Sequence, residues 1–164
     1  MVNLKKNVNI YIKEKRIALN LSQKEIAMAS NMTINEYCDI EDYEDEVYMV
    51  PTLGDIDRIC CVLEINLAEL FGFDPNSPRF PKDIVQLALE KKKISTLSLS
   101  NEVGIKESYI LNVEKEITNF RKWVMEPVIT LSKVLGLNIG SILNSIAKSK
   151  HNGVGIMGEN QPGS

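Results

Sequence analysis

Histidine and cysteine are scarce in this chain of 164 residues, and their scarcity narrows the chemistry open to it. The one histidine, His151, lies in a glycine-rich C-terminal stretch, so a Ser-His-Asp triad or a multi-histidine metal site has almost nothing to be built from. Of the three cysteines, Cys38, Cys60 and Cys61, the last two are adjacent and make a poor disulfide or metal frame. We therefore expect reduced thiols, no metal, no cofactor and no enzyme activity.

Long apolar runs are also missing. No apolar stretch approaches the roughly 18 residues that a membrane span requires. The N-terminal segment MVNLKKNVNI lacks the apolar core of a signal peptide. We expect a cytoplasmic protein with no membrane contact, and the composition, 44% apolar and 25% charged, is typical of one globular domain or two small ones.

Charge is distributed unevenly along the chain, although the formal net charge is only −3. Residues 1–72 carry 7 basic and 13 acidic side chains, whereas residues 73–164 carry 12 basic and 9 acidic ones. Because the first half is acidic and the second basic, the two halves are expected to differ in their partners.

Helix signals follow one another through the first half. Ser22 with Glu25 three residues later forms a capping box, the sequence signature of a helix N-terminus, and Thr33 with Glu36 repeats it. Pro51 then opens a further helix whose apolar residues recur at spacings of three and four. No convincing alternating strand pattern interrupts them, so the sequence predicts an all-α fold.

The second half repeats the order of the first at an offset of 73 and then 72 residues. The segment ISTLSLSNEVGI aligns with LSQKEIAMASNM, and VITLSKVLGLNIGSIL aligns with IDRICCVLEINLAELF. Two copies of one five-helix unit explain this pattern, and the segment between them is rich in proline, glycine and aspartate. We expect a first domain, a linker, a second domain and a flexible tail at residues 8–72, 73–81, 82–147 and 148–164.

The first copy resembles a known family. The segment LSQKEIA, then the apolar Tyr37 and Ile40 followed by Glu41, then PTLGDIDRICCVLEINLAELFG, is similar to the helix-turn-helix domain of the Cro and phage-repressor class, often called XRE. The similarity spans nearly all of residues 10–72. It implies a compact lambda-repressor-like fold in which the third helix enters the DNA major groove while the second helix crosses the backbone.

The second copy, residues 82–147, carries a weaker version of the same pattern. Thr96 replaces the usual glutamine at the start of the second helix, while Gly104 is kept in the turn where the first copy has Asn31. The resemblance thus implies two tandem helix-turn-helix domains in one chain.

Candidate DNA contacts gather in the second copy. Lysine and arginine can neutralise phosphates, serine and asparagine can bond base edges, and the start of the second helix offers N–H groups to a phosphate. The candidates there are Thr96, Lys106, Ser108, Tyr109, Asn112, Lys115, Arg121 and Lys122. In the first copy they are Gln23, Thr33 and Asn35. The competing interpretation of the basic surface is a solvated helix face without a ligand.

The first copy is a poor DNA reader because seven of the eleven residues from 36 to 46 are acidic. A carboxylate 4 Å from a phosphate is repelled by about 1 kcal/mol in water, and by less in salt. This run is a solvated helix end and loop, a protein-binding surface, or a DNA contact in a shifted pose. For a protein-binding surface the residues are Glu36, Asp39, Asp42, Glu44, Asp45 and Glu46.

Two functions follow from these patterns. The first is a repressor-like, DNA-binding transcriptional regulator that acts on double-stranded DNA, with the second copy making most of the contacts. The alternative is a protein-binding antitoxin, immunity or adaptor protein, in which the acidic first copy binds a basic protein partner. Since relatives of this class pair two heads on DNA, we also expect a homodimer that joins two second copies.

Overall fold

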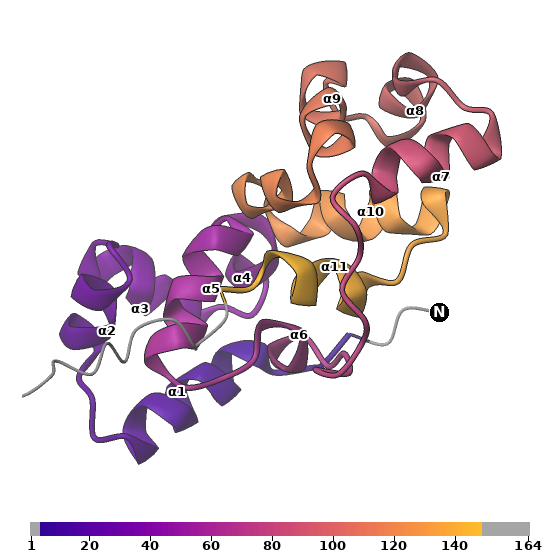
Figure 1. Ribbon diagram of the computed structural model, residues 1–164. Coiled ribbons are helices and arrows are strands. Elements are labelled where there is room, and N and C mark those ends of the chain that lie inside the picture. Colours follow the sequence, from indigo (N-terminus) through magenta and orange to yellow (C-terminus); the bar gives the residue numbers. More distant parts are fainter. Residues whose placement is uncertain (1–3, 149–164) are drawn as a thin grey trace, which may run out of the picture.

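The computed structural model describes residues 4–148, which form helices joined by turns and, between α6 and α7, by a longer linker (Figure 1). The elements are α1 (Val8–Ala18), α2 (Gln23–Ala29), α3 (Ile34–Asp42), α4 (Glu46–Met49), α5 (Leu53–Val62), α6 (Leu67–Leu70), α7 (Ile84–Lys92), α8 (Thr96–Val103), α9 (Glu107–Lys115), the 3-10 helix η1 (Ile117–Lys122), α10 (Met125–Leu135) and α11 (Ile139–Ile146). Residues 4–148 contain no strand, so the all-α class is confirmed for them. None of their helices is both long and apolar enough to cross a bilayer. Apart from Lys148, the expected C-terminal tail lies outside the described residues.

Side-chain caps set where the helices begin. The Glu25 N–H donates to the Ser22 hydroxyl (3.2 Å), and the Ser22 N–H donates to the Glu25 carboxylate (2.7 Å), which completes the predicted capping box of α2. Thr33 and Glu36 close the same box at α3, as predicted. Each box satisfies N–H groups that the first helical turn would otherwise leave unpaired.

The turns of the two halves match at the offsets expected from the sequence. Both halves place residues in the left-handed region, where glycine and asparagine are the least strained. The matched pairs are Asn20 and Lys93 (φ 55° and 55°), Asn31 and Gly104 (58° and 69°), and Glu64 and Gly136 (57° and 68°). The elements α1 to α6 thus correspond in order to α7, α8, α9, η1, α10 and α11.

Each half has one element more than the five helices expected. The short helix α4 in the first half and η1 in the second half fill the connection after α3 and α9. Val47 in α4 is fully buried, as is Phe120 in η1, while Ile117 is 2% exposed. Burial of these apolar side chains holds both connections against the core, because each such side chain stabilises the fold by about 1.5–3 kcal/mol.

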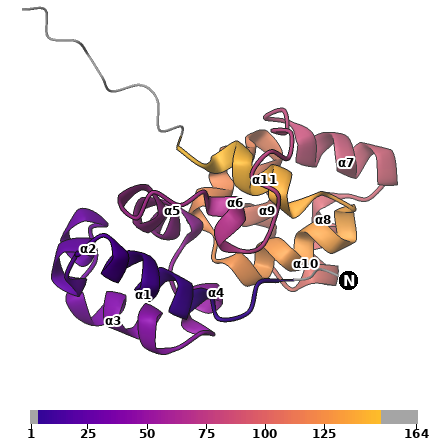
Figure 2. The same cartoon turned by 90° about the horizontal axis from the view of Figure 1, so that it is seen from below.

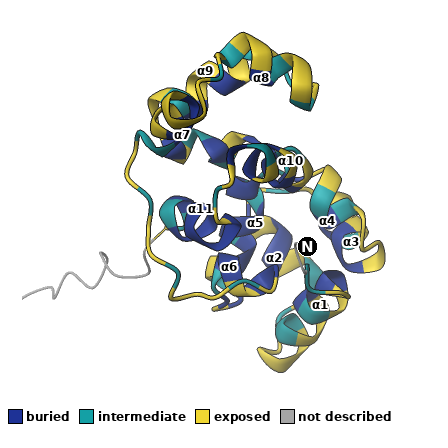
Figure 3. Ribbon diagram, turned by 90° about the vertical axis from the view of Figure 1, so that its right-hand side faces the viewer, coloured by how far each residue is buried: buried dark blue, intermediate teal, exposed yellow. Residues whose placement is uncertain are grey.

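The two halves pack against each other through their last helices. The helices α6 and α11 are in contact, α4 contacts α10, and α5 contacts η1. In the correspondence between the halves, α4 matches η1 and α5 matches α10. The contact of α4 with α10 is therefore the counterpart of the contact of η1 with α5, and the interface has an approximate two-fold relation. α6 and α11 lie centrally, with α1–α3 and α7–α8 at opposite ends (Figure 2). Residues of α11 other than Ser145 are buried, as the colouring in Figure 3 shows.

Three hydrogen bonds cross this interface, and the Lys148 N–H makes one of them to the Asp57 carboxylate (3.2 Å). The Leu53 N–H at the start of α5 donates to the Trp123 carbonyl (2.8 Å). The Arg121 guanidinium donates to the carboxylate of Asp57 (2.6 Å), which is 2% exposed, and to the Ile146 carbonyl (2.6 Å). The α5 backbone and η1 approach closely, since a Cβ at Gly54 would lie 3.0 Å from the Arg121 carbonyl oxygen.

Candidate nucleic-acid interface

The pair α8–α9 has a rigid inner face. Leu99, Ile110 and Val113 are fully buried and hold both helices on the core of the second half. Gly104 makes the turn at φ 69°, and the Ser100 hydroxyl donates to the Ile105 carbonyl (2.6 Å) across it. The opposite face of α9 is therefore presented outward, at the end of the molecule away from α2 and α3 (Figure 1).

The outward face of α9 is polar and includes Lys115, and further lysines flank the helix. Ser108, Asn112 and Lys115 are exposed and spaced by four and three residues, so they lie on one side of the helix. Lys106, the residue before the first turn, and Lys122 at the end of η1 are exposed as well. We call these five residues, Lys106, Ser108, Asn112, Lys115 and Lys122, the α9 face.

Tyr109 stands beside the α9 face and is half exposed. Its ring meets Trp123 edge-on, with centroids 6.3 Å apart, and Trp123 meets the buried Phe120 in the same way at 5.0 Å. Such aromatic pairs orient rings specifically. One side of the Tyr109 ring thus contacts Trp123, while about half of the side chain remains exposed to solvent.

Two other residues of the second half that were predicted to contact DNA, Thr96 and Arg121, instead bond to other side chains of the protein. The Thr96 hydroxyl donates to the Glu107 carboxylate (2.8 Å), so it ties α8 to α9. The Arg121 side chain is 22% exposed, and its guanidinium joins Asp57 in the interface between the halves. Arg121 therefore has a structural role, which the sequence did not predict, because its partner is 64 residues away.

In the first half, Gln23 belongs to a partly buried charge cluster. Its amide donates to the Glu41 carboxylate (2.9 Å), which also accepts from Arg16 Nε (2.6 Å). Burial alone would raise the pKa of Glu41, but the hydrogen bonds from Arg16 and Gln23 outweigh it and lower this pKa. The bond to Glu41 in turn raises the pKa of Arg16. Arg16 and Glu41 are 25 positions apart in the sequence, so the spacing of residues along the chain did not reveal their ion pair.

The second half does not repeat this cluster. Leu89 stands at the position that corresponds to Arg16, and Thr96 at that of Gln23.

Of the two remaining residues of the first half that were predicted to contact DNA, Thr33 and Asn35, one is bonded within the protein and the other is accessible. The Thr33 hydroxyl is committed to the cap of α3, whereas Asn35 is exposed.

The acidic run borders a small hollow lined by both acidic and apolar residues. This hollow, which we call the acidic notch, has a volume of about 140 Å³. Its lining consists of the carboxylate residues Glu36, Asp39, Glu46 and Asp55 and the apolar residues Met32, Ile40, Val50 and Pro51. Asp42, Glu44 and Asp45 are exposed in the same run but do not line it, and Glu44 accepts from the Asn7 N–H (2.5 Å). Hydrogen bonds from the Thr33 backbone and hydroxyl lower the pKa of Glu36, which keeps this part of the rim charged.

In comparisons with known proteins, no family model, no curated protein and no solved structure matches this chain. Among residues 4–148, no three histidine, cysteine, aspartate or glutamate side chains are grouped to hold a metal ion.

Proposed function

We propose that this chain is a DNA-binding transcriptional regulator built from two tandem lambda-repressor-like helix-turn-helix domains. The second domain makes most of the DNA contacts. The observation that carries the proposal is the α9 face, on which Ser108, Asn112 and Lys115 project together from a helix anchored on its other side. A rigid helix with polar and basic residues on one exposed side is suited to enter the major groove.

Each residue of the α9 face has a role in this proposal. Ser108 and Asn112 hydrogen-bond to base edges, because a hydroxyl and an amide can each donate and accept. Lys106, Lys115 and Lys122 neutralise phosphates on either side of the groove. Arg121 is not assigned a phosphate contact in this proposal, because its guanidinium is paired with Asp57.

The first domain contributes less to DNA binding in this proposal. The Gln23 amide is held by Glu41 and the Thr33 hydroxyl by Glu36, so neither is released without breaking a hydrogen bond. The carboxylates of the acidic run would also lie near phosphates in the standard pose and repel them. Asn35 is the predicted contact of this half that stays accessible.

A salt titration with random duplex DNA tests the proposal. The double variant Lys106→Glu with Lys115→Glu should bind DNA more weakly and lower the slope of log affinity against log salt by about 1.8, from about 0.9 for each lost phosphate contact. The matched control, Glu36→Gln with Asp39→Asn, removes repulsion from the first domain and should leave DNA affinity equal or slightly higher. Circular dichroism checks that both variants keep their helices. If the control loses DNA binding while the lysine variant retains it, the first domain is the reading head.

The expected homodimer is part of the proposal, but the structure constrains its interface. The helix α11 is packed on α6 of the same chain, so two second domains must pair through another surface. Light scattering that gives a strict monomer, bound one to one to DNA, would refute the dimer.

The acidic notch supports the second candidate function, an antitoxin, immunity or adaptor protein. A basic side chain with an apolar stem fits such a hollow, because the stem packs on Ile40 and Val50 while the charge meets the carboxylates. In this case the chain should bind random duplex DNA weakly at every salt concentration. The Glu36→Gln and Asp39→Asn changes would then abolish binding of the basic partner.

A further inference from the structure

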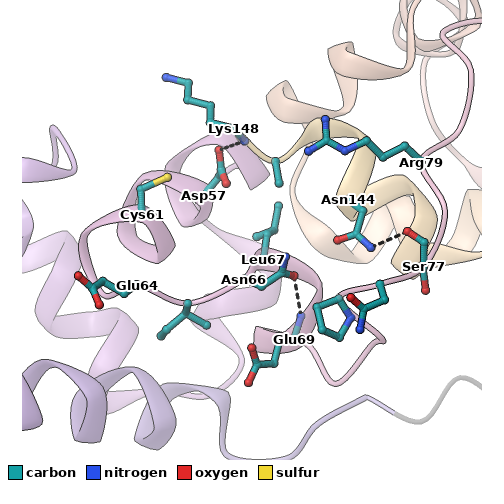
Figure 4. Close-up of a pocket in the computed structure, with 14 residues that line it drawn as sticks. Asp57, Cys61, Glu64, Asn66, Leu67, Glu69, Ser77, Arg79, Asn144 and Lys148 are labelled. Carbon is teal, nitrogen blue, oxygen red and sulfur yellow. Dashed lines mark hydrogen bonds between the residues drawn. The ribbon is translucent and has the colours of Figure 1, made fainter. Parts of the chain in front are cut away.

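A cavity of about 440 Å³ lies where the two halves and the linker meet (Figure 4). The first half supplies its wall from α5, α6 and the turn between them, the linker contributes residues 75–79, and α11 with Lys148 closes the other side. This volume is within the range of cavities that bind small molecules. The DNA contacts proposed above do not involve it.

Asn144 gives the cavity an oriented hydrogen-bond acceptor. The side chain comes from α11 and is 5% exposed. Its amide nitrogen donates to the backbone carbonyls of Asp74 (3.3 Å) and Ser77 (3.0 Å). Since carbonyl oxygens only accept, these two bonds fix which end of the amide is nitrogen, and Oδ1 points away from Ser77 (Figure 4). None of the hydrogen bonds among residues 4–148 ends on this oxygen, so it offers an acceptor to a ligand donor (Figure 4).

Charged side chains of both signs line the cavity. Glu64 and Glu69 come from the first half, and Arg79 and Lys148 from the linker and the end of α11 (Figure 4). Asp57 also lines the cavity, but Arg121 already neutralises its carboxylate. Two acidic and two basic groups outside that pair leave the cavity neutral as a whole, with Glu69 on α6 and Arg79 on the linker.

We propose that this cavity binds a small zwitterion, namely a free α-amino acid or a dipeptide. The ammonium group donates to Asn144 Oδ1 and lies on the side of Glu69, while the carboxylate lies on the side of Arg79. A ligand with only one charge would leave either Glu69 or Arg79 without a partner, and a ligand without an N–H or ammonium donor would not use the Asn144 oxygen. The ligand would touch both halves and the linker at once.

Isothermal titration calorimetry on the whole chain tests this inference, with the twenty free L-amino acids and glycylglycine as probes. We expect at least one probe to bind one to one. Arg79→Ala and Glu69→Ala should each weaken that binding by about tenfold or more, as expected for loss of a charged hydrogen bond. Both side chains are exposed, and within residues 4–148 neither makes a hydrogen bond or an ion pair, so these variants should fold normally. The matched controls Lys91→Ala and Glu90→Ala remove exposed charges on α7 and should leave the affinity unchanged.

Analogues of the best probe separate a zwitterion site from a simpler one. Its N-acetyl derivative lacks the ammonium charge and its amide lacks the carboxylate, so both should lose binding. The inference is overturned if no probe binds, if both cavity variants bind as well as the wild type, or if either analogue binds as tightly as its parent. None of these outcomes depends on whether the chain binds DNA.

Discussion

Replacing Arg121 with alanine tests whether the interface between the halves is a main source of stability. The variant leaves the Asp57 carboxylate, whose side chain is 3% exposed, without its guanidinium partner. Only the Lys148 N–H, at 3.2 Å, still donates to the same carboxylate oxygen among the described residues. The change also removes the bond from Arg121 to the Ile146 carbonyl.

The expected loss follows from these contacts. Breaking a buried ion pair from one side costs about 3–5 kcal/mol, because the remaining charge stays buried and unpaired. Arg121 is 22% exposed, and Asp57 keeps one hydrogen bond, so we expect the lower part of this range, about 3 kcal/mol. Adding Asp57→Asn removes the stranded charge and should recover about 1 kcal/mol or more, as coupled residues do in a double-mutant cycle.

Equilibrium unfolding in urea measures the loss, and the chain contains its own reporter. Its single tryptophan, Trp123, is 5% exposed, and the carbonyl of this residue accepts from Leu53 across the interface, so its fluorescence follows the separation of the halves. The neighbouring exposed Lys122 serves as the matched control, and Lys122→Ala should change the free energy of unfolding by no more than about 0.5 kcal/mol. A loss for Arg121→Ala no larger than that of the control would refute the reasoning.

Three further predictions concern single positions. Leu63→Ala and Leu135→Ala remove matched core side chains that are 1% and 4% exposed, and each should cost about 2–5 kcal/mol in urea unfolding; a loss below about 0.5 kcal/mol for both would contradict the alignment of the halves. The folded-state pKa of Glu41 is below its usual value of 4.5, so its stabilisation is present above that pH and is lost as the pH falls through the folded-state pKa. Glu41→Gln should therefore make acid unfolding, followed by circular dichroism, depend less steeply on pH. Gly104→Ala places a side chain at φ 69° and should lower the free energy of unfolding by about 1 kcal/mol; an unchanged urea midpoint would argue against the left-handed turn.

Local features of the sequence predicted much of the fold. The capping boxes at Ser22 and Thr33 form as expected because their partners are three residues away. The offset between the halves places Gly104 opposite Asn31 in equivalent turns, since both residues tolerate a positive φ. Signals of this kind depend on neighbours along the chain, so one sequence is enough to reveal them.

Contacts between distant segments could not be predicted in the same way. The sequence placed Arg121 among DNA contacts, whereas the structure pairs it with Asp57 across the interface. Gln23 matched a phosphate-binding position by resemblance, yet its amide is held by Glu41. The cavity beside Asn144 depends on the packing of three separate segments, and no pattern within any one of them indicates it.

The covalent linker between the halves makes their interface independent of protein concentration. In an assembly of two separate chains, dilution would separate the partners, but a tether keeps the effective concentration of one half near the other constant. The contact of α6 with α11 should thus not weaken on dilution, unlike the contact between the two chains of the proposed homodimer. Cutting the chain within the linker would turn the same contact into a bimolecular equilibrium, and each isolated half would present the apolar face of its last helix to any similar surface.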